Sequence, residues 1–393
     1  MNIVFITTLY PDNKAQSLTE VPYALHYFVK EWKKKGNNVQ VIKIEAKYPR
    51  YLPKYNKTNK NRVVRDTLID EVPIRVIQVK KKLNREFSES DSKNAGKKVA
   101  EFLANKEFKC DVIIFHVFNP SYFIAESIKV HFKAPVIFGV HQTDLNWLQR
   151  RNSKKKLKLY EKSIDGFAFR SNSLKNKFEK ILGKDSTKFV IPSGISEKSI
   201  NDDRITKKNN TSYITVSNLI KRKNIDIAIR AFSKMENKNN ITLTIIGDGE
   251  ERLRLQNLVN ELNLSKNIIF LGHLSREKVL LELDKHDFFI LPSINETFGV
   301  VYLEAMARSC IPIGIKNEGI DGVIQNGING YLIEPTINGV ISIMKTIEKL
   351  DKDRIFEIKN NVSETIRSYT DEKAAENYIQ NIKKTIERRQ NDE

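Results

Sequence analysis

Short apolar segments rich in valine and isoleucine alternate with helical patterns along nearly the whole chain. They comprise residues 3–7, 39–44, 74–79, 112–116, 136–140, 166–169 and 189–191, and then 213–216, 242–246, 268–271, 288–291, 312–315 and 330–333. Polar and apolar residues do not alternate within them, which is typical of strands buried on both faces of a parallel sheet. The pattern predicts an α/β protein built from doubly wound sheets.

A polar stretch over residues 196–212 separates the two series of strands. It predicts two domains, residues 1–195 and 196–370, with the next strand beginning near Tyr213. Residues 371–393 form a helical pattern, and we expect this C-terminal helix to pack back on the first domain. Its apolar face holds Ala375, Tyr378, Ile379, Ile382 and Ile386.

The net charge of +19 is unevenly distributed along the chain. Residues 1–200 hold 39 Lys and Arg against 20 Asp and Glu, whereas residues 201–393 hold 28 of each. This asymmetry favours a polyanionic partner for the first half, either an anionic membrane surface or a nucleic acid. The alternative is a solvated basic surface that binds no partner and only aids solubility. The basic segments 54–60, 80–82 and 154–158 have few aromatic residues that could stack on bases, so we expect no nucleic acid.

Neither a membrane-spanning helix nor a signal peptide is expected from the sequence. There is no run of about 18 apolar residues, and the N-terminus has the pattern of a first buried strand. Cys110 and Cys310 lie in apolar contexts and are expected to be buried thiols, in keeping with a reducing cytoplasm.

Residues 291–307 form the segment richest in candidate functional groups. A strand ends at Leu291, a turn follows, and a helix is expected to begin near Phe298 and Gly299. The free N–H groups of a helix start can bind a diphosphate, and a glycine allows its close approach. Glu296 and Glu304 stand in a Glu-x7-Glu spacing. From spacing alone, a carboxylate at the helix start and a solvated helix residue are an equally good interpretation.

This segment resembles the hallmark of retaining glycosyltransferases of family GT4. Residues 190–195, 216–223, 245–249, 269–272, 318–320 and 326–332 resemble further motifs of that family in the same order. The resemblance implies a GT-B fold, in which two facing Rossmann-like domains enclose a cleft and a C-terminal helix follows. It also implies a nucleotide-sugar donor, by family default a UDP-sugar, without any cofactor.

The resemblance assigns roles to individual residues of the second domain. Glu296 would bind hydroxyls of the transferred sugar, and Glu304 both ribose hydroxyls. Lys223 would neutralise the phosphate as the glycosidic bond breaks. The backbone N–H groups that would bind the diphosphate are those of Phe298, Gly299 and Val300.

Two features depart from the family pattern. Asn218 stands where the family usually has an arginine, and Arg222 could supply the missing charge. The loop at residues 14–22 lacks the usual glycines. Ser17 and Thr19 in this loop could line the acceptor side or merely cap a helix.

In the first domain, His141 directly follows a strand and is itself followed by Asp144. This segment resembles the Val-His-Gly-x-Asp motif of the family, which implies that His141 lies beside the reacting sugar while Asp144 orients a neighbouring group. His116 also ends a strand and is the second choice. The other four histidines, His26, His131, His273 and His286, are expected to be structural.

No metal site is predicted. Asp351 and Asp353 form the kind of pair that binds divalent metal in another glycosyltransferase fold, but they lie in a late helical segment. The segment from Gly247 to Gly249 does not match a dinucleotide-binding fingerprint.

Together these observations predict a retaining, metal-independent glycosyltransferase. Its acceptor would be a saccharide or a lipid-linked saccharide in bacterial surface-polysaccharide synthesis. We expect it in the cytoplasm, attached peripherally to the membrane through residues 33–35, 80–82 and 150–156. The alternatives are a soluble acceptor, an epimerase of the same fold and a nucleic-acid-binding protein. The epimerase would need a cluster of acid and base carboxylates in the first domain.

Overall fold

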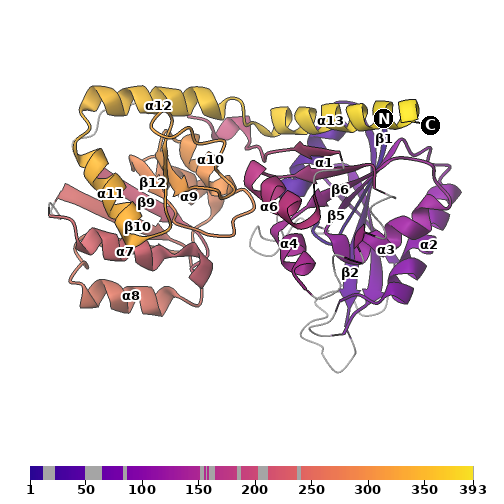
Figure 1. Cartoon of the computed structure of the whole chain (residues 1–393), viewed down its shortest axis with the longest axis horizontal. Coiled ribbons are helices and arrows are strands. Elements are labelled where there is room, and N and C mark those ends of the chain that lie inside the picture. The colour runs from indigo at the N-terminus through magenta and orange to yellow at the C-terminus, as the bar shows by residue number, and fades with distance from the viewer. Residues whose placement is uncertain are drawn as a thin grey trace. The chain divides into compact units, whose positions relative to one another are not determined.

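The computed structural model describes residues 1–11, 23–48, 64–82, 86–150, 155, 157–158, 164–183, 187–201, 211–236 and 240–392. The chain forms two compact units (Figure 1). The first contains residues 1–170, 174–191 and 371–393, and the second contains residues 171–173 and 192–370. The division after Ile191 falls slightly before the boundary expected at residue 195.

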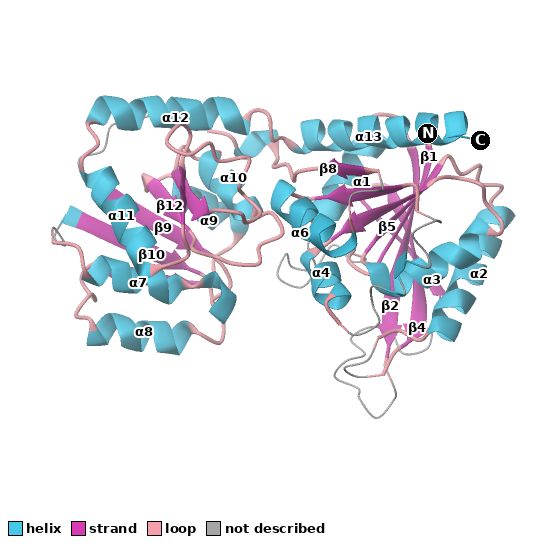
Figure 2. Cartoon of the chain, in the orientation of Figure 1, coloured by secondary structure: helices cyan, strands magenta, loops and turns pink. Residues whose placement is uncertain are grey.

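The first unit is built around an eight-stranded sheet with the order β3-β4-β2-β1-β5-β6-β7-β8 (Figure 2). All neighbouring strands pair in parallel except β3 and β4, which form an antiparallel hairpin at the edge. The strands are β1 (Asn2–Thr7), β2 (Asn38–Lys47), β3 (Val64–Ile69), β4 (Val72–Lys80), β5 (Val112–His116), β6 (Val136–Val140), β7 (Gly166–Phe169) and β8 (Lys188–Val190).

Helices cover both faces of this sheet. Successive residues of β1 show this, since Ile3 and Phe5 pack in one core cluster and Val4 and Ile6 in another. This is the period of two expected for a strand buried on both sides. The helices of the unit are α1 (Ala24–Lys34), α2 (Glu89–Asn105), α3 (Phe118–Lys129), α4 (Gln142–Leu148), α6 (Asn172–Leu182) and α13 (Asp371–Asp392).

Helix α13 completes the core of the first unit although it comes from the end of the chain. Tyr378 packs edge-on against Phe28 and Trp32 of α1. The indole N–H of Trp32 donates to the carbonyl of Ala375 at 3.0 Å. Ala375, Tyr378 and Ile382 are fully buried, as the apolar face of the sequence pattern requires.

The second unit contains a six-stranded parallel sheet with the order β11-β10-β9-β12-β13-β14. Its strands are β9 (Thr211–Val216), β10 (Ile241–Ile246), β11 (Ile268–Gly272), β12 (Phe288–Ile290), β13 (Ile311–Ile315) and β14 (Tyr331–Ile333). Its helices are α7 (Ile225–Ser233), α8 (Arg252–Glu261), α9 (Arg276–Leu283), α10 (Val300–Met306), α11 (Ile337–Glu348) and α12 (Lys352–Ile366).

The predicted α/β class with two doubly wound units is confirmed, and three local expectations need correction. Helix α10 begins at Val300, because Gly299 adopts a left-handed conformation with φ 84° and precedes the first helical residue. Strand β9 begins at Thr211 rather than Tyr213. Cys310 is buried as expected, but Cys110 is only partly buried. Within the described ranges, no helix combines the length and apolar composition needed to cross a bilayer.

Gly139 of β6 is required by a close packing contact at the centre of the first sheet. It pairs in register with His116 of β5. A Cβ atom at position 139 would lie 2.0 Å from Cε1 of the His116 imidazole, far inside van der Waals contact. The fully buried His116 ring therefore occupies the space that any larger residue at position 139 would need.

We predict that Gly139→Ala destabilises the first unit by about 1–3 kcal/mol or more, because the buried ring has to move. Gly166→Ala is the matched control, since its Cβ would meet no atom closer than 3.5 Å. The measurement is denaturant unfolding followed by tryptophan fluorescence, because both tryptophans, Trp32 and Trp147, belong to the first unit. Equal stability of the two variants would contradict the steric argument.

Candidate functional site

Two loops at the carboxyl edge of the second sheet are joined by one backbone hydrogen bond and one from a side chain. One follows β9 and contains a short 3₁₀ helix over Lys221–Lys223, and the other follows β12. These strands are neighbours and parallel, so their carboxyl ends lie at the same edge. The N–H of Ile294 donates to the carbonyl of Arg222 at 3.0 Å, and the Asn224 amide donates to the carbonyl of Pro292 at 3.1 Å.

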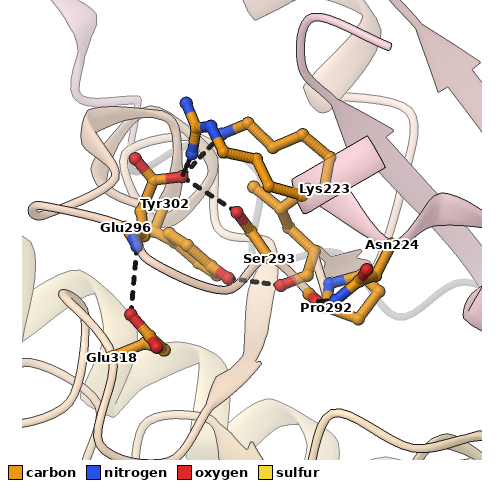
Figure 3. Close-up of polar contacts among 9 residues, drawn as sticks. Lys223, Asn224, Pro292, Ser293, Glu296, Tyr302 and Glu318 are labelled. Atoms are coloured by element: carbon orange, nitrogen blue, oxygen red, sulfur yellow. Dashed lines mark hydrogen bonds and ion pairs between the residues drawn. The ribbon is translucent and has the colours of Figure 1, made fainter. Parts of the chain in front are cut away.

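Glu296 is the centre of a charged cluster formed by these loops (Figure 3). Its Oε2 atom lies 2.5 Å from Nζ of Lys223 and 3.2 Å from a guanidinium nitrogen of Arg222. The hydroxyl of Ser293 donates to the same oxygen at 3.0 Å. Three donors thus converge on one carboxylate oxygen and hold the carboxylate in a fixed orientation.

Burial and charge act in opposite directions on this pair. Burial is the largest influence on Lys223 and lowers its pKa, although the Glu296 charge opposes this. Burial is the largest single influence on Glu296 and raises its pKa. The charges of Lys223 and Arg222 and the hydrogen bonds from Lys223 and Ser293 together outweigh burial, so the Glu296 pKa lies below its ordinary value. Glu296 therefore stays ionised at neutral pH.

Glu318 is a site residue to which the sequence analysis gave no role. Its Oε2 atom accepts a hydrogen bond from the backbone N–H of Glu296 at 3.0 Å (Figure 3). The adjacent Gly319 leaves no room for a side chain, because a Cβ there would lie 2.5 Å from Cα of Phe298. The segment after β13 thus packs against the loop at residues 292–299 and supports it. Only its likeness to a family motif marked it in the sequence.

The start of α10 is held against the end of β12. The hydroxyl of Tyr302 donates to the carbonyl of Leu291 at 2.6 Å (Figure 3). Phe298 is buried, whereas Gly299 and Val300 are partly exposed. The three backbone groups expected to bind the diphosphate are therefore consecutive at the beginning of α10, on the same loop as Glu296.

Glu304 forms an ion pair with Arg276 at 2.8 Å, between α10 and the start of α9. Burial raises the pKa of its carboxyl group, and the Arg276 charge opposes this rise. Glu304 is thus a partly buried, paired residue and not a solvated helix carboxylate. Arg276 gave no signal in the sequence, because nothing distinguishes it from other surface arginines.

Asn218 is exposed, and its side chain makes no hydrogen bond with any described residue, those of the Glu296 cluster included. The turn that contains Gly247 and Gly249 packs against this loop. A Cβ at Gly247 would lie 1.8 Å from the carbonyl oxygen of Ser217, so these glycines serve close backbone packing.

In the first unit, His141 and His116 lie side by side at the carboxyl edge. His116 Nδ1 and His141 Nε2 are 2.9 Å apart. Burial lowers the pKa of both rings, with that of His141 falling to about 3 and the Arg170 charge contributing to both. Both imidazoles are therefore neutral at physiological pH. Tyr378 of α13 lies 3.4 Å from the other nitrogen of His116, which links α13 to the pair.

Asp144 anchors the loop that carries His141. One carboxylate oxygen accepts from the N–H of Phe118 and the other from the N–H of His141, both at 2.8 Å. Burial raises the pKa of Asp144 to about 7 despite these bonds. Val117 beside it has a φ of 72°, which strains a β-branched residue. Such strain is common near functional sites.

Other expected positions have different outcomes. Ser17 and Thr19 lie outside the described residues. His26 bridges Tyr10 and Asp70, and His286 bonds a carbonyl and Thr244, which are structural contacts. Among the described residues, no group of three or more His, Cys, Asp or Glu is arranged to hold a metal ion.

Comparison with known proteins finds a family match over most of the second unit and part of α13. Residues 196–384 match the family model described as "Glycosyl transferases group 1". N-acetyl-alpha-D-glucosaminyl L-malate synthase of Bacillus anthracis is 34% identical over 154 residues. The match covers 39% of this chain and 39% of that enzyme, well under two thirds of its length.

Solved structures match nearly the whole chain. Sucrose-phosphate synthase from Thermosynechococcus elongatus has a TM-score of 0.72 at 17% identity, covering 97% of this chain and 98% of that one. HepE from Anabaena in complex with UDP has a TM-score of 0.71 at 17% identity, covering 98% and 100%. The fold is therefore that of the GT-B class. The match over residues 196–384 makes this part of the chain similar to the group 1 glycosyl transferases.

We predict that the contribution of Asp144 to the stability of the first unit decreases as pH rises from about 4 to about 7. The folded state holds a proton there that the unfolded chain has already released, so the free energy of unfolding falls with pH. The buried histidines act in the opposite direction, since their pKa values are lowered. The two effects are separated by comparing the protein with its Asp144→Asn variant in urea unfolding at each pH.

The stability of the unsubstituted protein relative to Asp144→Asn should fall by a few kcal/mol across that range, since each unit of pKa shift corresponds to about 1.4 kcal/mol. A difference that stays constant with pH would show that Asp144 is ionised at its ordinary pKa.

Proposed function

We propose that this protein is a retaining glycosyltransferase that transfers a sugar from a nucleotide diphosphate sugar to a saccharide or lipid-linked saccharide. The observation that carries the proposal is the cluster of Lys223, Arg222 and Glu296 at the carboxyl edge of a group 1 glycosyl transferase unit. UDP in the HepE structure supports a UDP-sugar as donor.

The geometry suits separate groups for the two parts of the donor, one set for its phosphates and another for its sugar. Lys223 and Arg222 pair with Glu296 on the loop that leads into α10. At the start of α10, the N–H groups of Phe298, Gly299 and Val300 would bind the diphosphate. Within the described residues, all side-chain donors to Glu296 contact Oε2, so Oε1 can accept a hydroxyl of the sugar. Glu304 would accept the ribose hydroxyls.

Catalysis would depend on charge and positioning. As the bond between the sugar and the diphosphate breaks, negative charge grows on the leaving phosphate, where Lys223 would stabilise it. That phosphate would take the proton of the attacking hydroxyl on the same face, which retains the anomeric configuration. His141 is neutral, so it would act there as a hydrogen-bonding group. None of these steps assigns a role to a metal ion.

We predict that Lys223→Ala lowers kcat by about 100-fold or more, because the charge it meets develops in the transition state. Glu304→Ala should instead mainly raise the donor KM, because the ribose hydroxyls lose their acceptor. Lys221→Ala is the control, since this exposed neighbour makes no side-chain contact within the described residues. The assay measures transfer from UDP-sugars with EDTA present, and NMR reads the anomeric configuration of the product.

Several outcomes would contradict parts of this proposal. A Lys223→Ala enzyme altered only in donor affinity would remove the proposed role of Lys223. Loss of activity in EDTA with rescue by manganese would exclude metal independence. An inverted product would exclude retention. If no nucleotide sugar stabilises the protein in a thermal-shift screen, the proposed function is contradicted. A ligand at 100 times its Kd should stabilise it by about 2.7 kcal/mol.

We also propose that the basic first unit attaches the protein to the inner face of the cell membrane, near a lipid-linked acceptor. Lys34 and Lys35 contribute less than their sequence suggests, because they form ion pairs with Glu31, Glu372 and Glu376. Lys33 donates to the main-chain carbonyl of Glu71. The exposed Lys80 and Lys82 remain candidates, as does Arg150. Arg151, Lys154 and Lys156 lie outside the described residues.

We expect sedimentation with anionic vesicles to weaken as salt increases, and to weaken again in a Lys80→Gln, Lys82→Gln double variant. Each basic residue near an anionic surface contributes about 1 kcal/mol, and salt screens this attraction. The control removes the same charge from the other unit, in Lys345→Gln, Lys349→Gln. Binding that ignores lipid charge and salt, or absence of binding, would remove the membrane proposal and leave the enzymatic one intact.

A further inference from the structure

A pocket of about 460 Å³ opens at the carboxyl edge of the first sheet, and the residues that line it belong to the first unit. Three segments line it, one following each of β4, β5 and β6. These strands point the same way in the sheet, so the three segments meet at one edge. The proposed donor chemistry uses none of the pocket's cationic or amide groups.

Asn119 gives this pocket a hydrogen-bond donor in a fixed orientation. Its Oδ1 atom accepts from the backbone N–H of Phe87 at 3.0 Å, which settles the orientation of the amide group. Its Nδ2 atom is buried and has no hydrogen-bond partner among the described residues. A buried donor without a partner is unfavourable, so a ligand oxygen that accepts a hydrogen bond from this atom would be stabilising.

Two cations line the same pocket. Lys81 lies with Nζ 4.9 Å from the centre of the Phe87 ring, and it makes no ion pair with any described residue. Arg150 is mostly exposed, with a guanidinium nitrogen 3.7 Å from Glu86. Glu86 balances only one of the two cations, so these three side chains leave an excess of positive charge.

The pocket also offers groups that suit hydroxyls. Glu86 is fixed by the Trp147 indole, which donates to its Oε1 atom at 2.8 Å. The side chain of Thr143 adds a hydroxyl that can donate or accept. Asp144 has both oxygens engaged by backbone N–H groups, so it shapes the pocket wall.

We propose that this pocket binds a polyhydroxylated ligand that carries a phosphate or carboxylate group, with Asn119, Lys81 and Arg150 around the anionic group. Resting on the proposed function, this ligand would be the acceptor, an acidic or phosphorylated saccharide. The basic segments at residues 80–82 and 150 then have a local role, because both reach this one pocket.

The test is calorimetric titration of the full chain with glucose 6-phosphate, glucuronate and glucose. At least one of the two anions should bind about tenfold or more tightly than glucose, since hydrogen bonds to charged groups are the stronger ones. Lys81→Met keeps the packing on Phe87 but removes the charge. Asn119→Asp keeps the acceptor for the Phe87 N–H but replaces the donor by an oxygen. Each should weaken anion binding by about tenfold or more.

Lys97→Met in α2 is the matched control, because this exposed lysine lies outside the pocket and should leave anion binding unchanged. Equal affinity for glucose and both anions, or unchanged anion binding in Asn119→Asp, would overturn the proposal. If nucleotide sugars bind and none of the three sugars does, this pocket assignment fails and the proposed function stands. If an anionic sugar binds and nucleotide sugars do not, the proposed function fails and the pocket assignment stands.

Discussion

Parallel strand pairing is the constraint on which the rest of this structure depends. A parallel pair cannot be closed by a tight turn, so each connection must cross back over a face of the sheet. The loop that begins each crossover, directly after its strand, therefore lies at the carboxyl edge of the sheet. In each unit, groups from distant parts of the sequence therefore meet at that edge, as Lys223 and Glu296 do in the second unit and His116 and His141 in the first.

Burial at these edges controls the charge state of the site. Glu296 keeps its charge because two cations and a hydroxyl surround it. Two residues of the first unit become neutral or nearly so for lack of such partners, because burial lowers the pKa of His141 and raises that of Asp144. The second unit thus presents charged groups at its edge, whereas the first presents mainly hydrogen-bonding groups beside the basic pocket.

The sequence predicted the sheets well because strands buried on both faces are recognisable as continuous apolar runs. Strand β3 was not predicted because it is an edge strand, and polar Arg65, Asp66 and Thr67 interrupt the apolar residues of Val64–Ile69. At the site, Lys223 and Glu296 were recognisable because they occupy a motif. Glu318 also lies in a motif, but its bond to the Glu296 backbone joins two separate segments, which the motif does not show. Arg276 lies in no motif and acts through its contact with Glu304 in another helix. The ion pair of Glu304 with Arg276 could not be predicted, because it also joins two separate segments.

Helix α13 has a consequence for synthesis on the ribosome. The second unit, residues 192–370, leaves the ribosome before α13 does, although α13 belongs to the first unit. Until then, Trp32 and Phe28 lack the layer formed by Ala375 and Tyr378. Domains usually fold in the order in which they emerge. Here the second unit is complete while the first still exposes an aromatic surface. The first unit therefore begins to fold first and finishes last.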